Sequence, residues 1–321
     1  MRIWYEETPD GLVIGRLYGD SPEVVVPEEI DGKPVTSLGA YAFSEKEVLT
    51  DGMSHDVQQH SSTDMSTGVE CSVYTQDEET VCALAGDFIT RVSLPDSLKR
   101  IGELCFYQCR NLREISFGAG AIEIGSDAFM NCRNLSTLRI RTRADKPTAL
   151  RSILNQRTQA TDVWFSDAVV HFPEYQEKYD LIGPAHIFEL NIEGEGFRAR
   201  KCFDGDRFSL AMYDEVFRHA MEKEDERTLC RMAAFRLSRP DAGAAGGQQA
   251  QLKEEDRERY QSYLLEHIDV FCDDLIRRRD LSVWEDLWHQ GLLTSEHKAI
   301  CLKKMTEARW IEGTRQVLGM A

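Results

Sequence analysis

The residue types best suited to nucleophilic or metal chemistry in this chain of 321 residues are nine cysteines and eight histidines. A cysteine close to a histidine can act as a nucleophile, and clusters of the two can bind a transition metal. The histidines are scattered, and no two cysteines form a CxxC pair. Glycine-rich phosphate loops, the HExxH zinc motif and the GxSxG nucleophile motif are also absent. We therefore expect a protein without catalysis, cofactor or metal.

An acidic segment at about residues 45–87 offers two alternatives to this view. Its aspartates could bind calcium, although their spacing lacks the EF-hand pattern and its closing glutamate; these are Asp51, Asp56 and Asp64. Its histidines and one cysteine could bind a transition metal; these are His55, His60 and Cys71. Residues 45–90 carry ten acidic side chains and one basic side chain, which is about half of the net charge of −17. We interpret the segment as a solvated acidic loop, with a small hairpin near Val69–Leu84.

A second kind of site is conceivable where the two halves of the chain join. Titratable side chains there could converge on a substrate or small ligand, and they are His186, Glu189, Asp204, Asp206 and Tyr213. A deep pocket that excludes water and shifts the pKa values of carboxylates would favour this reading. An enzyme or small-ligand-binding protein is therefore the alternative to a protein without catalysis.

Charge and hydropathy restrict the partners and the location. Acidic side chains outnumber basic ones by 55 to 38, which disfavours binding to nucleic acid and to anionic membranes. The first residues contain no apolar leader segment, and no apolar run reaches the roughly 20 residues that span a bilayer. We expect a cytoplasmic protein whose cysteines are mostly buried free thiols.

The elements that must position any site come from an internal repeat in the first half. From Ile89 onward, a shift of 23 residues superposes the apolar positions and repeats the tetrapeptide Cys-Arg-Asn-Leu at 109–112 and 132–135. An earlier, partial copy begins near Val26, and about 40 inserted residues interrupt it after Phe43. Alternating apolar residues predict a short, half-buried strand in each copy, and stacked copies predict a solenoid with a parallel strand ladder.

Other repeated positions indicate how one copy folds. Phe106 and Phe129 recur at the shift and are expected to fill the core beneath the strands. Gly102 and Gly125 recur as well, and we interpret them as residues that allow a tight bend.

The repeat resembles the bacterial BspA-like class of leucine-rich repeats. Residues 24–43 (VVVPEEIDGKPVTSLGAYAF) and 93–115 (SLPDSLKRIGELCFYQCRNLREI) carry its pattern IP-x-x-[VL]-x-x-IG-x-x-AF-x-x-C-x-x-L. The resemblance covers about residues 10–140, and a closing element extends it to about 182. It implies a leucine-rich repeat solenoid that binds another protein. Many members are exported, so it also raises surface exposure, for which this sequence shows no leader.

In leucine-rich repeats, the outward face of the strand ladder is the usual docking surface. The repeat register places Arg91 beside Glu114 and Thr137, and Ser93 beside Ser116 and Arg139. The predicted partner-binding residues are Arg91, Ser93, Glu114, Ser116, Arg139 and Arg141. We expect Arg139 and Arg141, together with Arg143, to meet an acidic segment of a partner or the acidic loop of this chain. A solvated strand face without a partner is the alternative.

The second half has a helical apolar period. A short β connector with a turn at residues 194–196 precedes it. Helices are predicted over 214–224 and 225–238, and one long stripe follows at Tyr260, Leu264, His267, Phe271 and Leu275. Residues 286–318 are similar to ankyrin-type helical repeats.

Together these patterns predict an α+β repeat protein with three parts. A leucine-rich repeat domain covers residues 1–185, the β connector covers 186–210, and an α-helical repeat domain covers 211–321. The predicted function is that of a non-catalytic protein–protein interaction module, which uses the outward ladder face and the helical domain.

Overall fold

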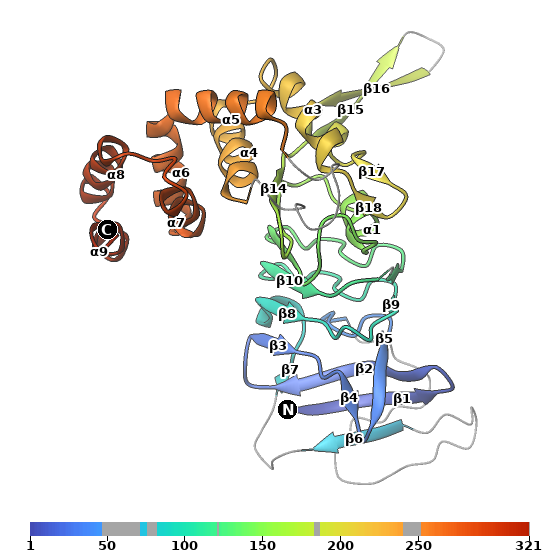
Figure 1. Cartoon of the computed structure of the whole chain (residues 1–321). Helices are drawn as coiled ribbons and strands as arrows, with labels where there is room; N and C mark the ends of the chain where they lie inside the picture. The colour runs from blue at the N-terminus through green and yellow to red at the C-terminus, as the bar shows by residue number, and fades with distance from the viewer. Residues whose placement is uncertain (47–70, 76–81, 121, 183–186, 240–251, 321) are drawn as a thin grey trace. The chain divides into compact units, whose positions relative to one another are not determined.

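The computed structural model describes residues 1–46, 71–75, 82–120, 122–182, 187–239 and 252–320 of the chain (Figure 1). The chain forms two compact units. The solenoid unit comprises Met1–Thr142, Lys146–Gln159 and Gly205–Arg207, and the helical unit comprises Arg143–Asp145, Ala160–Asp204 and Phe208–Ala321. Short strands build the first and mainly helices build the second, so the predicted α+β repeat class is confirmed.

The repeats of the solenoid unit stack their strands into a parallel ladder (Figure 1). Its strands are β3 (Glu23–Val25), β8 (Arg91–Ser93), β10 (Glu114–Phe117) and β12 (Thr137–Ile140). Val92 lies opposite Val24 on one side and Ile115 on the other, and all three are buried. The interrupted first copy therefore joins the ladder in the register that the sequence predicts, despite the long insertion that follows it.

A second sheet lies in the same unit and contains an N-terminal hairpin that the repeat does not predict. Its strands are β1 (Arg2–Thr8), β2 (Gly11–Gly19), β4 (Glu29–Ile30), β5 (Lys33–Leu38), β6 (Cys71–Thr75), β7 (Cys82–Ala83), β9 (Arg100–Ile101) and β11 (Glu123–Ile124). Strands β5, β9 and β11 run parallel. Strand β6 pairs with β1 and β7 pairs with β2. The hairpin predicted near Val69–Leu84 is therefore wrong, because the open edges of the β1–β2 hairpin bind these two segments separately.

The core of the solenoid unit repeats one set of contacts from turn to turn. The rings of Phe43 and Phe106 stack with centroids 4.9 Å apart, and those of Phe106 and Phe129 stack at 5.4 Å. Cys109 donates its thiol hydrogen to the Phe43 carbonyl at 3.1 Å, and Cys132 donates to the Phe106 carbonyl at 2.9 Å. Phenylalanine and cysteine recur at the shift because each turn binds its predecessor through this pair.

Gly102 and Gly125 are required by close stacking of turns and not by a tight bend, which corrects the sequence-based interpretation. Neither has a positive φ. A Cβ on Gly102 would lie 2.5 Å from the Ala40 nitrogen, and one on Gly125 would lie 2.4 Å from the Glu103 nitrogen. No side chain fits between backbones this close, so glycine sets the spacing of the turns.

Replacing Gly102 with alanine is expected to destabilise the solenoid unit by about 1–3 kcal/mol, because the backbone of the neighbouring turn must move. The matched control is Gly319→Ala, whose new Cβ would lie 3.5 Å from the carbonyl oxygens of Arg315 and Gln316. Urea unfolding of both variants measures the difference. Equal midpoints for the two variants would show that the turns have room for a methyl group.

Two buried arginines satisfy backbone carbonyls near the ends of the stack. Arg16 on β2 donates through Nη1 to the carbonyls of Tyr41, at 3.0 Å, and Ser44. Arg157 follows α1 (Leu150–Asn155), and it donates to the carbonyls of Cys132, at 3.0 Å, and Leu135. Burial lowers the pKa of Arg157 to about 10. Both guanidinium groups therefore provide donors to carbonyls that are buried near the two ends of the stack.

The helical unit begins with two antiparallel hairpins. Its strands are β13 (Thr161–Trp164), β14 (Val169–Phe172), β15 (Gln176–Ile182) and β16 (Ile187–Glu193), and short strands β17 (Phe203–Asp204) and β18 (Arg207–Phe208) follow near Gly205. Strand β16 pairs back onto β15. The turn predicted at residues 194–196 is therefore wrong. Gly196 instead begins the short helix α2 (Gly196–Ala199), where it packs against the Pro173 carbonyl.

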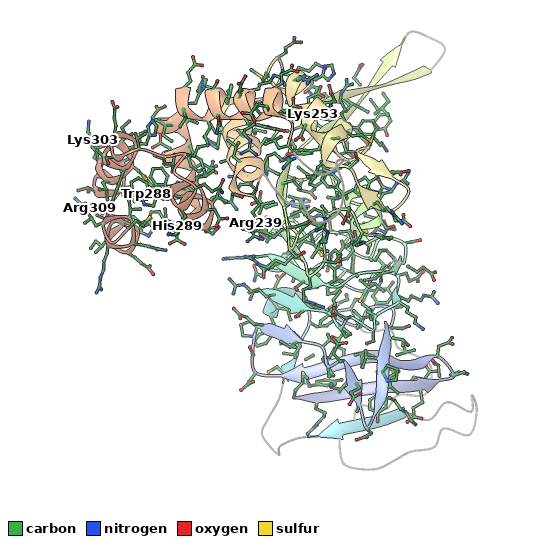
Figure 2. All side chains as sticks on the ribbon, in the orientation of Figure 1. Arg239, Lys253, Trp288, His289, Lys303 and Arg309 are labelled. Carbon is green, nitrogen blue, oxygen red and sulfur yellow. The ribbon has the colours of Figure 1, made fainter. Side chains whose placement is uncertain are left out.

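Seven helices follow among the residues that the structure describes (Figure 1). They are α3 (Leu210–Ala220), α4 (Glu226–Ser238), α5 (Glu254–Glu266), α6 (Ile268–Arg278), α7 (Ser282–His289), α8 (Ser295–Glu307) and α9 (Ile311–Leu318). Helix α4 packs on β14, α5, α6 and α7. Asp225 caps the start of α4, and Thr294 caps α8. Trp284 on α7 is buried, whereas the Trp288 ring lies 5.0 Å from Lys298 Nζ (Figure 2).

The long apolar stripe predicted from Tyr260 to Leu275 is two helices and not one. Helix α5 ends at His267, whose Nδ1 lies 2.9 Å from the Tyr263 carbonyl oxygen, and α6 starts at the next residue. Tyr260 and Leu275 are both buried. The spacing of apolar residues continues across the break, which is why the sequence pattern did not detect it.

A buried charged cluster joins the first three long helices of this unit. Asp214 on α3 accepts hydrogen bonds from Arg236 Nε at 2.9 Å and Nη2 at 3.1 Å, and from the Tyr260 hydroxyl at 3.0 Å. Each of the three side chains is at most 4% exposed. Burial raises the pKa of Asp214, and the Arg236 guanidinium opposes that rise. Each carboxylate oxygen of Asp214 has a donor, which offsets part of the cost of burying the pair.

Candidate functional site

The outward face of the ladder has the register that the sequence predicts. Glu114 lies opposite Arg91 on β8 and Thr137 on β12, and Ser116 lies opposite Ser93 and Arg139. Strand β3 adds Glu23 beside Arg91 and Val25 beside Ser93. The solenoid therefore brings the predicted residues Arg91, Ser93, Glu114, Ser116 and Arg139 together on one face.

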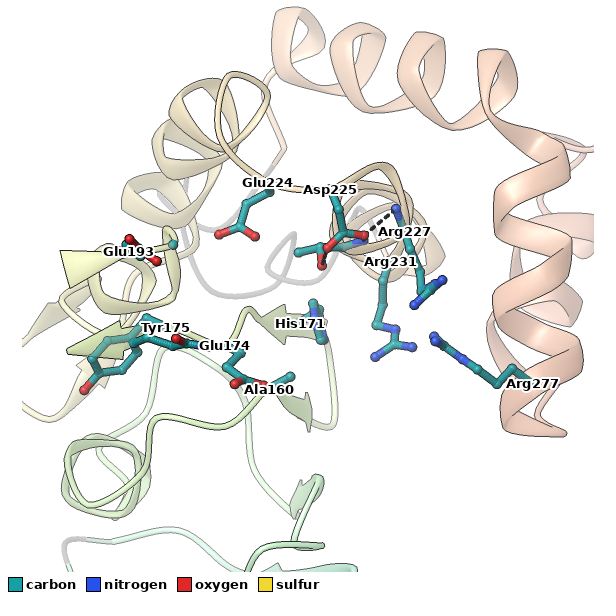
Figure 3. A pocket seen from close by; sticks show the side chains of 13 residues that line it. Ala160, His171, Glu174, Tyr175, Glu193, Glu224, Asp225, Arg227, Arg231 and Arg277 are labelled. Carbon is teal, nitrogen blue, oxygen red and sulfur yellow. Dashed lines mark hydrogen bonds between the residues drawn. The ribbon is translucent and has the colours of Figure 1, made fainter. Parts of the chain in front are cut away.

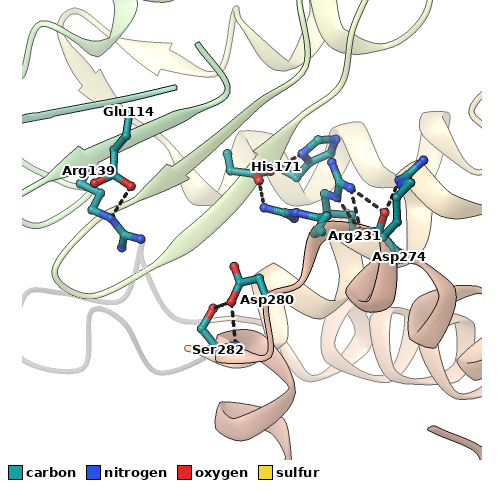
Figure 4. A network of polar contacts seen from close by, with 10 residues as sticks. Glu114, Arg139, His171, Arg231, Asp274, Asp280 and Ser282 are labelled. Carbon is teal, nitrogen blue, oxygen red and sulfur yellow. Dashed lines mark hydrogen bonds and ion pairs between the residues drawn. The ribbon is translucent and has the colours of Figure 1, made fainter. Parts of the chain in front are cut away.

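The arginines of this face each contact an acidic side chain of the same unit. Arg91 Nη1 lies 3.1 Å from a Glu23 carboxylate oxygen, and Arg139 Nε lies 2.9 Å from one of Glu114 (Figure 4). The side chains of Arg91 and Arg139 are 58% and 48% exposed, so water screens both pairs. Glu23 and Glu114, two residues of the ladder itself, therefore provide the acidic contacts of these two arginines. The acidic segment at residues 47–70 lies outside the described residues.

Arg141, which follows β12, is held more firmly than the other two arginines. Its Nη2 lies 2.7 Å from Asp96, and its Nη1 donates to Ser116 at 2.7 Å and to Ser93 at 3.3 Å. Nη2 also donates to the Leu94 carbonyl. Arg141 therefore orders the serine row beneath it, and its substitution would alter the ladder itself. Arg143 belongs to the other unit, where it pairs with Asp145 at 3.1 Å and Asp167 at 3.6 Å.

Glu23 and Asp96 are the residues of this face that the sequence analysis missed. Glu23 could have been found from the partial first copy, because Val24 matches Val92 and the preceding residues then match as well. Asp96 follows the strand and matches Glu28 of the partial first copy, but the next copy has Ala119 at this position. With Glu23 and Asp96 included, this surface carries three arginines and three acids. Its charge is therefore mixed.

Three of the residues proposed for a site at the join of the two halves have side chains that the structure describes. Tyr213 is fully buried, and its hydroxyl donates to the His171 carbonyl. Asp204 and Asp206 are exposed. His186 and the side chain of Glu189 lie outside the described residues. Tyr213 is therefore a core residue, and the combination expected for catalysis is not formed by the described members.

A polar network in the helical unit surrounds His171 and was not found by sequence analysis. His171 on β14 pairs across the strands with Asp162 on β13, and its Nδ1 lies 2.7 Å from an Asp162 oxygen. Asp162 also binds Arg278 at the end of α6. Arg231 on α4 binds Asp274 on α6 with both Nε and Nη2, at distances from 2.6 to 3.0 Å (Figure 4). The network ties the β13–β14 hairpin to two helices.

Burial and charge shift the titration of the central pair in this network. Burial acts to raise the pKa of Asp162, but the His171 hydrogen bond and the Arg278 charge outweigh it and lower that pKa to about 2. Burial lowers the pKa of His171, against the hydrogen bond to Asp162, which acts to raise it. The pair is therefore a carboxylate and a neutral imidazole that donates from Nδ1.

This pair predicts that the helical unit loses stability as pH falls from neutral. The unfolded chain protonates a histidine near pH 6.5, whereas folded His171 does so at lower pH, so protons favour unfolding in that interval. Stability falls again at lower pH because of Asp162. Its pKa is 3.8 in the unfolded chain and about 2 in the folded chain, so protons favour unfolding between these values. Urea midpoints at about pH 7.5 and about pH 5.5 test the first step. His171→Gln keeps a donor but does not titrate, so it should lose less stability between these pH values; an equal loss would exclude His171 as the cause.

The described residues contain neither a metal-binding cluster nor a membrane-spanning helix. Within them, no group of three or more histidine, cysteine or acidic side chains is placed to hold a metal ion. The candidate calcium and transition-metal residues of the insertion lie outside the described part, as does the Cys71 side chain. No described helix is both long enough and apolar enough to cross a membrane.

The parallel ladder and the stacked phenylalanines define a leucine-rich repeat solenoid. A family model described as "BspA type Leucine rich repeat region" matches residues 82–175 in six copies, so these residues form a BspA-type repeat region. The match begins at residue 82, near the end of the insertion, and the structure adds the earlier copy through β3. No curated protein and no solved structure matches the chain.

Proposed function

We propose that this protein is a non-catalytic interaction module that binds another protein through the outward face of its ladder. The proposed surface consists of Arg91, Ser93, Glu114, Ser116, Arg139 and Arg141. The observation that supports it best is that residues from successive repeats stand in register and are held by neighbours before any partner arrives. A surface ordered in advance loses less conformational entropy when it binds.

The energetics of the ladder arginines also support this proposal. Exposed ion pairs such as Arg91–Glu23 and Arg139–Glu114 contribute about 0–1 kcal/mol each, so a partner can replace them at small cost. Arginine is enriched among the residues that dominate binding energy at interfaces. Because the face carries three acids as well as three arginines, the partner is expected to present side chains of both signs rather than acids alone.

The proposal is tested by photo-crosslinking in cells that make this protein. A photoreactive amino acid at position 116 should crosslink the partner, because Ser116 lies in the middle of the proposed surface. The control position is Glu103, an exposed residue that follows β9 in the other sheet of the unit. A specific product from position 116 and none from position 103 is the expected result. The same product from both positions, or none from 116, would contradict the assignment of the ladder face.

A further inference from the structure

A polar cavity in the helical unit is lined by none of the residues of the proposed ladder surface. Its volume is about 520 Å³, within the range of small-ligand sites. Residues of α4 and α6 line one part of it, and residues from the ends of β14, β15 and β16 line another (Figure 3). All lining residues belong to the helical unit.

One end of the cavity is cationic. Arg227 and Arg231 stand one helical turn apart on α4, and Arg277 reaches the same region from α6 (Figure 3). Buried Asp274 binds both Arg231 and Arg277 and so fixes their guanidinium groups in place. Arg231 uses Nε and Nη2 for this carboxylate, which leaves its Nη1 donors for another acceptor.

The charge at this end is not balanced by its surroundings. The single negative charge of Asp274 balances the positive charge of only one of the two arginines that it binds. Among the described residues, the Arg227 side chain has no hydrogen-bond or ion-pair partner. Asp225 also lines the cavity, and its carboxylate, which caps α4, offsets part of the Arg227 charge. Arg227, Arg231 and Arg277 still exceed Asp225 and Asp274 by one positive charge. The end can therefore accept an anionic group, and two preset guanidinium groups make a carboxylate a suitable one.

The opposite end of the cavity is acidic. Glu174, Glu193 and Glu224 line it, on the other side of His171 from Arg231 and Arg277 in the view of Figure 3. Glu193 is paired with Lys178 at 2.6 Å, and Glu224 accepts the Glu195 N–H at 2.6 Å. Glu174 has no side-chain partner within the described part of the chain. This end offers one free carboxylate to a cation.

His171 lines the cavity between the two ends. Its Nδ1 donates to Asp162, so Nε2 of the neutral ring is an acceptor. No described residue donates a hydrogen bond to this Nε2. A ligand N–H group would provide the missing donor.

We propose that this cavity binds a short peptide with free termini. Its carboxylate lies at the Arg227, Arg231 and Arg277 end, its ammonium group lies at Glu174, and one of its N–H groups donates to His171. Opposite charges at the two ends of the cavity favour a ligand whose charges are well separated. A free α-amino acid carries its two charges on adjacent groups, and an inorganic anion would gain nothing from the acidic end.

The test is isothermal titration calorimetry of the full chain with trialanine as the probe. Trialanine amide lacks the carboxylate and N-acetyl-trialanine lacks the ammonium group, so each should bind at least roughly tenfold more weakly than trialanine. Inorganic phosphate is the fourth probe. The proposal is overturned if trialanine does not bind, if either blocked peptide binds as tightly, or if phosphate binds as tightly as trialanine.

Substitutions of Arg227 and Glu174 test whether these two residues bind trialanine. Arg227→Gln and Glu174→Gln each remove an unpaired charge and leave the Asp274 cluster intact, so both should weaken trialanine binding by roughly tenfold. Arg315→Gln on α9 changes an exposed helical arginine outside the cavity and should leave the affinity unchanged. Unchanged affinity in Arg227→Gln would contradict the cationic end. Neither residue belongs to the ladder face, so this outcome is independent of the proposed protein-binding function.

Discussion

Replacing Phe106 with alanine is expected to destabilise the solenoid unit by about 3–5 kcal/mol. Phe106 is fully buried and stacks on Phe43 at 4.9 Å and on Phe129 at 5.4 Å. Truncation removes both ring contacts and leaves a cavity between two turns, which the stacked backbones cannot close. Hydrogen exchange of the β8 and β10 amides reports this loss directly, because those strands lie on the same turns.

The matched control for this change is Phe88→Ala. Phe88 lies in the short 3-10 helix Gly86–Phe88 and is 40% exposed, so its truncation should cost much less. If the two variants unfolded within about 1 kcal/mol of each other, the phenylalanine stack could not be the main source of stability in this unit.

Replacing Asp214 with alanine is expected to cost the helical unit about 3–5 kcal/mol. The substitution leaves the Arg236 charge buried without its partner and removes the acceptor of the Tyr260 hydroxyl. Arg236 is 1% exposed, and its Nη1 has no partner even in the intact cluster. Water cannot replace the lost carboxylate without opening the contact between α3, α4 and α5.

Tryptophan fluorescence during urea unfolding measures this effect, since Trp164, Trp284, Trp288 and Trp310 all lie in the helical unit. The control is Glu215→Ala, the next residue on α3, which forms an exposed ion pair with Arg218 at 2.8 Å. It should change stability by less than about 1 kcal/mol. An Asp214→Ala variant as stable as this control would show that the buried pair contributes no net stability.

The sequence predicted the ladder well because the repeat determines both the buried face of each strand and the register between strands. Apolar alternation fixes which face of each strand is buried, and the constant shift fixes which residues stand side by side. The register of Glu114 with Arg91 and Thr137 followed from these two facts alone. The stacked phenylalanines followed in the same way.

Features that depend on a single position or on distant residues were not predictable from this pattern. The break at His267 interrupts a helix without interrupting its apolar period. The role of Gly102 depends on the backbone of the preceding turn, which the local sequence does not describe. The cavity requires Arg231 and Arg277 to meet over Asp274, and their approach is set by the packing of α4 on α6.

The most direct test of the central claim is to follow the position-116 crosslink in two charge-reversal variants. Arg91→Glu with Arg139→Glu reverses the two exposed arginines of the ladder face and leaves Arg141 to order the serines. Lys99→Glu with Arg133→Glu makes the same change in net charge at exposed positions outside the ladder strands. A ladder-face interaction predicts that the crosslinked partner disappears in the first variant and persists in the second. An equal yield in both would contradict the claim that this face binds the partner.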